Sequence, residues 1–296
     1  MNDVPPADTK PSKFFGGSTL PNPVHVPTDV RKYLAQAHHW KVGFSACELA
    51  TSWVGAGDIP TPVRQVLDSA PEWQGAAFIE GNFEKQVDLR TPGRPSQTDL
   101  MVTMRLASGA GILAVEGKVD ESFGPFVREL PDTTGYGVRT AHLQRLLGVT
   151  PTDAGGLRYQ LFHRTASALF EAERYAANHA VMLVHSFSKS DSSLPDFVTF
   201  ATAIGMVGAG KGRLSEPRIF AGAPSVSLRM GWVARSSVGA IRRHELSPEA
   251  RSGMAIATVI GAPPHPAVER RPRPLPPSRT SRGIQERRLD PSLRSE

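Results

Sequence analysis

Two acidic residues and a lysine, Asp99, Glu116 and Lys118, stand in two neighbouring segments whose composition is typical of β-strands. In residues 98–106 the side chains alternate along the chain, and residues 112–119 form a second strand-like run. The five residues between these segments are small and rich in glycine, which favours a tight turn. We therefore expect a hairpin that gathers two carboxylates and an ammonium group on one face of a sheet.

The register of this hairpin decides whether the three side chains meet. If the turn centres on residues 108–109, Asp99 lies opposite Lys118, and residues that face each other share a side of the sheet. The same register pairs Met101 with Glu116. A slip of one residue would send Asp99 to the other side of the sheet.

Carboxylates next to a backbone carbonyl form an oxygen ligand set that suits Mg²⁺ and leaves positions for water and phosphate. We expect Asp99 and Glu116 to hold Mg²⁺, or Mn²⁺ in its place, with the Gly117 carbonyl as a further ligand. Lys118 would orient or deprotonate the attacking water and offset charge on the phosphate. The expected reaction is hydrolysis of a phosphodiester. The alternative is a ladder of salt bridges on a solvated sheet face, without catalysis.

The net charge of +6 comes from the end of the chain. Residues 235–296 contain 12 Arg and 6 Asp or Glu, so residues 1–234 are neutral, with 22 basic and 22 acidic side chains. Affinity of the main body for nucleic acid must therefore come from a local patch. The single cysteine, Cys47, excludes an internal disulfide and fits a cytoplasmic location. No apolar stretch approaches the roughly 20 residues that span a bilayer, so we expect no membrane segment.

The composition divides the chain into three parts. Residues 1–27 are rich in Pro, Gly and Ser and predict an irregular N-terminal arm. Residues 28–235 predict an α/β domain. Residues 236–296 predict a basic, Pro- and Arg-rich tail that is largely disordered, because it has few large apolar residues to offset its chain entropy.

Within the domain, helices and strands are expected in an order that builds a mixed sheet covered by helices. Helices are expected over residues 28–39, 46–53, 139–147 and 157–178, with a short one from Thr61. Strands are expected over residues 83–89, 98–106, 112–119, 181–187, 197–203 and 226–233.

Residues 95–99, Pro-Ser-Gln-Thr-Asp, and residues 115–124, Val-Glu-Gly-Lys-Val-Asp-Glu-Ser-Phe-Gly, resemble the signature of the PD-(D/E)xK, or restriction-endonuclease-like, nucleases. More narrowly, the chain resembles an uncharacterised bacterial family within that superfamily, over about residues 40–235. The resemblance implies an α-β-β-β-α-β core, with Asp99 and Glu116 as metal-binding acids and Lys118 as the catalytic lysine. Ser96 departs from the first half of the signature, whereas the Glu-x-Lys half is intact.

Many members of the superfamily carry a third acid on the first core helix. Glu48 is the acid on that predicted helix, and Glu84, on the strand before the hairpin, is the competing candidate. Gln97 and Ser96 are candidates for contact with the substrate phosphate. The resemblance implies a DNA substrate, and a homodimer would suit a nuclease that cuts both strands.

Two other interpretations remain open. A protein with this fold that has lost catalysis would bind nucleic acid or another protein through the same face. A nucleotide-binding protein would use residues 205–212, which resemble a phosphate-binding P-loop. In this segment Gly212 replaces the Ser or Thr whose hydroxyl should reach Mg²⁺.

Overall fold

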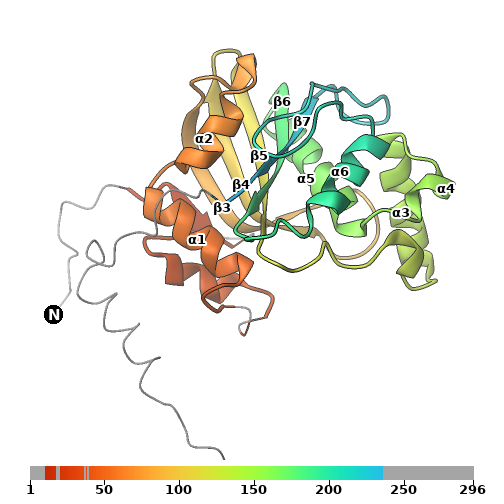
Figure 1. The fold of residues 1–296 in the computed structure, drawn as a ribbon, viewed down its shortest axis with the longest axis horizontal. Coiled ribbons are helices and arrows are strands. Elements are labelled where there is room, and N and C mark those ends of the chain that lie inside the picture. The colour runs from red at the N-terminus through yellow and green to blue at the C-terminus, as the bar shows by residue number, and fades with distance from the viewer. Residues whose placement is uncertain (1–10, 18–20, 37, 39, 236–296) are drawn as a thin grey trace, which may run out of the picture. The chain divides into compact units, whose positions relative to one another are not determined.

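The computed structural model describes residues 11–17, 21–36, 38 and 40–235. The chain separates into two units, Met1–Val238 and Gly239–Glu296, and every described residue belongs to the first. The predicted tail, residues 236–296, therefore lies outside the described residues. The described part is an α/β fold around a seven-stranded mixed sheet, with the strand order β2-β1-β3-β4-β5-β6-β7 (Figure 1).

The strands are β1 (Phe14–Gly16), β2 (Asn22–Pro23), β3 (Ala77–Val87), β4 (Ser96–Leu106), β5 (Gly109–Lys118), β6 (His179–Ser186) and β7 (Ser227–Val233). The α-helices are α1 (Ser45–Ala56), α2 (Thr61–Leu67), α3 (Thr134–Leu147), α4 (Pro151–Ala154), α5 (Tyr159–Arg174) and α6 (Leu194–Ala203). The 3₁₀-helices are η1 (Pro27–Tyr33), η3 (Pro71–Trp73) and η4 (Val127–Glu129).

Strands β3, β4 and β5 form an antiparallel meander at the centre of the sheet. The chain then passes through α3, α4 and α5 before β6 pairs with β5 in parallel, and β7 pairs with β6 in parallel. The elements α1, β3, β4, β5, α5 and β6 therefore follow one another in the predicted order of helix, three strands, helix and strand.

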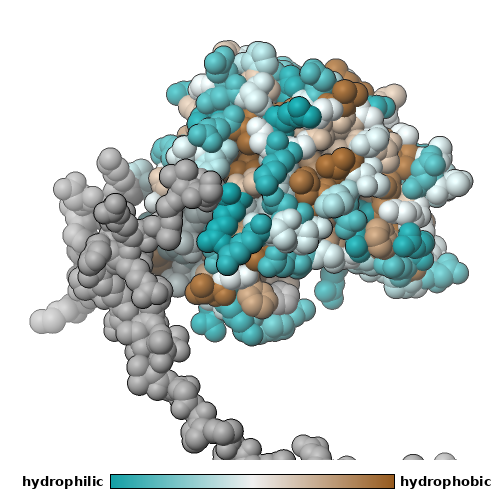
Figure 2. Space-filling model, in the orientation of Figure 1, coloured by the Kyte–Doolittle hydropathy of each residue, from teal (hydrophilic) through white to brown (hydrophobic). Residues whose placement is uncertain are grey.

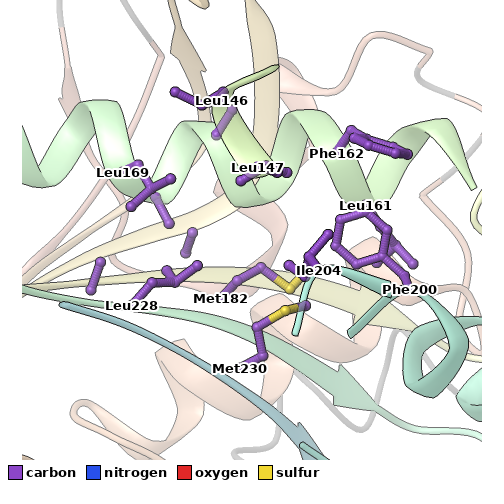
Figure 3. Close-up of a cluster of buried hydrophobic side chains, with 14 of the residues drawn as sticks. Leu146, Leu147, Leu161, Phe162, Leu169, Met182, Phe200, Ile204, Leu228 and Met230 are labelled. Atoms are coloured by element: carbon purple, nitrogen blue, oxygen red, sulfur yellow. The ribbon is translucent and has the colours of Figure 1, made fainter. Parts of the chain in front are cut away.

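The sheet has a separate apolar core on each face. Alternating residues of β5 show this: Leu113 and Val115 pack with the cluster that includes α1 and α2, whereas Ile112 and Ala114 pack with the cluster that includes α3, α5 and α6. Figure 3 shows part of the second core, where leucines and phenylalanines of the helices meet methionines and leucines of β6 and β7. On the molecular face in Figure 2, hydrophobic residues form small patches separated by hydrophilic ones.

The helix boundaries follow local chemistry. Helix α3 ends where Gly148 adopts a left-handed conformation with φ of 67°, as its position after the apolar run predicts. Helix α5 is shorter than the predicted 157–178, since Ala176 has φ of 51° and interrupts the helical backbone before β6.

One predicted strand is a helix. Residues 197–203 belong to α6, which begins with Pro195 in its first turn. Its buried residues Phe197, Phe200 and Ala201 recur with the spacing of a helix face, whereas a strand would bury every second residue.

The prediction of a wholly irregular arm is also wrong. Strand β1 pairs in parallel with β3, and β2 pairs with β1, so described residues of this segment extend the sheet. Phe14 attaches this segment to the core, because its ring centroid lies 5.0 Å from that of Phe78 and 5.8 Å from that of Phe83. Strand β3, Ala77–Val87, begins before the predicted 83–89 and is longer.

The hairpin forms as expected but with another register. Met101 pairs with Ala114, and Leu106 pairs with Gly109, so the turn centres on residues 107–108. The predicted pairing of Met101 with Glu116 is therefore wrong by two residues. A shift of two residues keeps every side chain on its original face, because side chains alternate with a period of two.

Candidate active site

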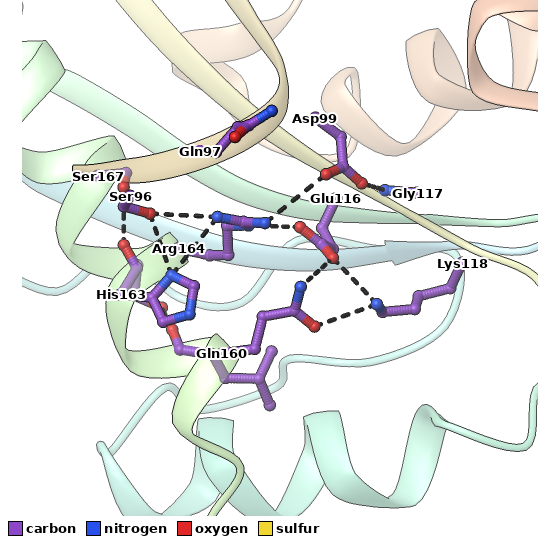
Figure 4. Close-up of polar contacts among 12 residues, drawn as sticks. Ser96, Gln97, Asp99, Glu116, Gly117, Lys118, Gln160, His163, Arg164 and Ser167 are labelled. Carbon is purple, nitrogen blue, oxygen red and sulfur yellow. Dashed lines mark hydrogen bonds and ion pairs between the residues drawn. The ribbon is translucent and has the colours of Figure 1, made fainter. Parts of the chain in front are cut away.

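The ends of β4 and β5 bring the predicted acids together. The register that pairs Leu100 with Val115 places Asp99 across from Glu116 at the next step. The Gly117 N–H donates a hydrogen bond to Asp99 Oδ2 over 2.9 Å and ties the carboxylate to the neighbouring strand (Figure 4).

Glu116 is buried and has hydrogen-bond partners on both carboxylate oxygens. Lys118 Nζ and Gln160 Nε2 donate to Oε1 over 3.0 and 2.7 Å, and Arg164 Nε donates to Oε2 over 2.5 Å. Burial alone would raise the pKa of Glu116, but the positive charges of Arg164 and Lys118 outweigh it and lower the pKa to about 2. Glu116 is therefore a carboxylate at neutral pH.

Lys118 lies in the same network. Its Nζ also donates to Gln160 Oε1 over 3.1 Å and lies 4.9 Å from the centre of the Phe123 ring. The side chain is only 5% exposed, so Gln160 and Glu116 hold the ammonium group in one place.

Glu84 stands directly beside these residues, on the adjacent strand. Phe83 pairs with Leu100, so the next residue of β3, Glu84, lies across from Asp99. Gln97 Nε2 donates a hydrogen bond to Glu84 Oε2 over 2.6 Å. Of the two candidate third acids, Glu84 is thus the one beside Asp99.

The backbone of β3 is irregular at this point. Glu84 has φ of 55°, a left-handed conformation that is uncommon for a residue with a side chain. Phe83 belongs to the core on the α1 side, whereas Lys85 pairs with Glu171 of α5 over 3.6 Å on the other side. Residues two apart in a regular strand share a face, so the strand twists through Glu84.

Too little positive charge lies near Glu84 and Asp99 to offset the burial of their carboxyl groups and the charge of the neighbouring acids. Burial and the charge of Asp99 raise the pKa of Glu84 to about 8. Burial and the charge of Glu116 raise the pKa of Asp99 to about 7, against the opposing effect of Arg164 and Lys118. A cation beside these two groups would favour their ionised forms.

A cavity of about 610 Å³ opens next to the two acids. Glu84, Gln97, Asp99 and Arg164 line one part of it, and residues 43–46, at the start of α1, line another. Glu116 and Lys118 lie deeper, with residue exposures of 2% and 4%.

Ser96 does not line the cavity. It is 4% exposed, its Oγ lies 3.0 Å from His163 Nδ1, and it accepts a hydrogen bond from Arg164 Nη1 over 3.1 Å. Burial and the neighbouring Arg164 lower the pKa of His163 to about 3, so the imidazole is neutral. Ser96 and His163 therefore position Arg164.

Glu48 has a different local role. Its Oε1 accepts a hydrogen bond from the Gly43 N–H over 2.8 Å and so fixes the loop that enters α1. Lys211, in the segment that imitates a P-loop, is paired with Asp191 over 2.6 Å. The structure brings neither Glu48 nor Lys211 into the network around Glu116.

The carboxylate oxygens near the cavity are of the type that binds a hard divalent cation. They are not arranged as a complete metal site. Among the residues that the structure describes, no three His, Cys, Asp or Glu side chains are grouped to hold a metal ion. Arg164 contacts both Asp99 and Glu116 and stands between the two acids predicted to share the ion. Asp99 and Glu84 line the cavity with carboxylate oxygens, the kind of donor that Mg²⁺ and Mn²⁺ prefer, and Arg164 also contacts Asp99.

Sequence reasoning missed the contribution of α5. Gln160, His163, Arg164 and Ser167 recur at the spacing of one helix face within a run of apolar residues. This polar stripe was the signal in the sequence that could have identified these residues, because polar side chains are unusual on the face of a helix that packs on a sheet.

The fold and the site thus define an α/β protein with a cluster of acids and buried cations at the ends of β3, β4 and β5. A family model described as a domain of unknown function (DUF6946) matches residues 23–237, and the chain belongs to this family. The match includes every site residue described above. No curated protein and no solved structure matches the chain. No helix within the described ranges combines the length and apolar character needed to cross a membrane.

Proposed function

We propose that the protein is a metal-dependent nuclease that hydrolyses phosphodiester bonds in DNA. The observation that supports this function best is the meeting of Asp99, Glu116 and Lys118 in one network beside a cavity, with Glu84 across from Asp99.

The order of elements adds support for a restriction-endonuclease-like core. Helix α1, the meander of β3, β4 and β5, helix α5 and strand β6 match the α-β-β-β-α-β order that the resemblance implies. Asp99 lies on the second of these strands, β4, and Glu116 on the third, β5.

The residues of the site would have the following roles in this reaction. Asp99 and Glu84 would hold Mg²⁺ or Mn²⁺ at the cavity, and the ion would polarise the phosphate and acidify a water molecule. Lys118, fixed by Gln160 and Glu116, would position the attacking water. Gln97, which donates a hydrogen bond to Glu84 and lines the cavity, would contact the phosphate.

Purified protein incubated with single-stranded, duplex and branched DNA in Mn²⁺ tests this proposal. We expect cleavage by the wild type and a loss of at least about 100-fold in Lys118→Ala, the magnitude typical of a group that moves or orients a proton. Lys211→Ala is the matched control, because Lys211 pairs with Asp191 outside the network. Cleavage by Lys118→Ala at the wild-type rate would remove the assigned role of the lysine.

A second candidate is a protein with this fold that binds nucleic acid or a protein partner without catalysis. The contacts of Arg164 and Lys118 favour it, because they neutralise much of the acidic charge from within the chain. Calorimetric titration with Mn²⁺ separates the two candidates. Metal binding that Asp99→Asn abolishes supports the nuclease, and the absence of binding supports the second candidate.

A further inference from the structure

Arg164 is the most highly connected side chain of the site. Its Nε donates to Glu116 over 2.5 Å, its Nη1 donates to Ser96 over 3.1 Å, and its Nη2 lies 3.6 Å from Asp99 Oδ1. The side chain is 8% exposed and still forms part of the cavity wall. A guanidinium group is always charged and has five donors in a fixed plane, which suits this bridge between two carboxylates.

The contacts on the two acids differ in quality. The contact with Glu116 is a short, buried hydrogen bond, whereas the contact with Asp99 is longer and involves a side chain that is 22% exposed. Ser96 and His163, which do not line the cavity, contact Nη1 of the guanidinium. The contact with Asp99 is therefore the one that can be released while Arg164 stays in place.

We propose that Arg164 is a positioning residue that serves as the internal counter-ion of the metal-free site and competes with the divalent cation for Asp99. This inference rests on the proposed function for the identity of the cation. The competition lowers the affinity for metal, because the ion must replace a positive charge that already stabilises the carboxylate. The bond to Glu116 persists in both states and keeps that acid ionised.

Calorimetric titration of metal into the full-length protein tests this inference without any measurement of activity. The probe is Mn²⁺, and its binding to the wild type is compared with binding to Arg164→Gln. Removal of the competing charge should lower the Kd for Mn²⁺ about tenfold, within the range typical of coupling between two sites. Arg164→Lys, which keeps the charge but loses the planar bridge, should have a Kd between the two.

Arg229→Gln is the matched control. Arg229 is a buried arginine that pairs with Glu72 over 2.5 Å and lies outside the cavity wall. Its loss should destabilise the protein in the same way as loss of Arg164, yet leave the Kd for Mn²⁺ unchanged. Circular dichroism checks that each variant is folded, and if Arg164→Gln is unfolded, the Arg164→Lys variant decides.

Each outcome separates this inference from the proposed function. A Kd for Mn²⁺ that is unchanged or higher in a folded Arg164 variant overturns the inference, even if the wild type cleaves DNA. Tighter binding in Arg164→Gln without cleavage by any variant supports the inference and contradicts the nuclease. The absence of Mn²⁺ binding by both the wild type and the Arg164 variants overturns both.

Discussion

Glu84 is the residue whose role the structure changes most. The sequence offered Glu48 and Glu84 as alternatives, and the structure places Glu84 across from Asp99, while Glu48 accepts a hydrogen bond from Gly43. The left-handed backbone of Glu84 is a strained conformation, which structures retain where the surroundings enforce it and which is frequent at functional sites.

Exchange of each glutamate for glutamine distinguishes the two candidates. Glu84→Gln should weaken Mn²⁺ binding and cleavage about tenfold or more, because it removes a charged oxygen ligand from the cavity. Glu48→Gln keeps an acceptor oxygen for the Gly43 N–H and should leave both unchanged. Calorimetry and a cleavage assay measure the effects, and equal losses in the two variants would contradict the assignment.

His185 provides a prediction about stability. It is 3% exposed, its Nδ1 accepts a hydrogen bond from Trp53 Nε1 over 3.2 Å, and burial lowers its pKa to about 3. The folded protein therefore keeps this imidazole neutral while the unfolded chain binds a proton below about pH 6.5. The stability that this group contributes is present above pH 6.5 and is lost as the pH falls towards 3.

His185→Asn retains an acceptor for Trp53 and cannot take up the proton. The stability advantage of the wild type over this variant should shrink by about 2 kcal/mol between pH 7 and pH 5, at about 1.4 kcal/mol per pH unit below pH 6.5. Urea unfolding at both pH values measures it. His163, Asp99 and Glu84 titrate in both proteins, so their effects cancel in the comparison. A stability difference that is the same at both pH values would show that His185 takes up a proton in the folded protein as it does in the unfolded chain.

At the scale of elements, α6 shows why residues 197–203 were misread as a strand. The segment is rich in residues that favour strands, but its buried positions follow a helical period and its first turn contains Pro195. Propensity is weak over so few residues, and packing of the buried face against the sheet decided the outcome.

Two alanine substitutions test this element. Phe200→Ala should destabilise the protein by about 3 to 5 kcal/mol, because Phe200 is fully buried and its ring lies 5.0 Å from that of Phe162. Val198→Ala should cost under about 1 kcal/mol, because Val198 is 38% exposed. In a strand the two residues would share a face, so similar losses in urea unfolding would contradict the helix.

At the scale of the whole molecule, the excess positive charge and the residues of the proposed site lie in different parts of the sequence. Residues 239–296 contain 11 Arg and 6 Asp or Glu, whereas every residue of the proposed site lies within the unit that ends at Val238. Lysines and arginines that contact phosphates release counterions, and the dependence of binding on salt reports their number.

A chain that ends at Val238 tests this separation. The slope of log affinity for DNA against log salt should become less negative by roughly 2 to 5, because basic residues that can contact phosphate are removed. The cleavage rate at saturating DNA should remain that of the full chain. Fluorescence anisotropy across a series of salt concentrations measures the slope, and an unchanged slope would place the DNA contacts within the first unit.

The sequence by itself determined the hairpin and the side of the sheet on which Asp99, Glu116 and Lys118 meet. It could do so because these relations are local: a short turn joins the strands, and alternation with a period of two preserves the face even though the register was wrong by two residues. The C-terminal end of α3 and the position of β7 followed from similarly local signals, whereas α3 begins at Thr134 and not at the predicted residue 139.

Only the tertiary structure decided which groups surround those three residues. Glu84 reaches Asp99 because β3 twists at a left-handed residue, and Arg164 reaches Glu116 because α5 packs across the sheet. Glu116 and Arg164 are 48 residues apart in the chain, and their contact depends on how a helix settles on two strands. The burial and the charge environment of these residues arise from that packing, which joins segments far apart in the sequence.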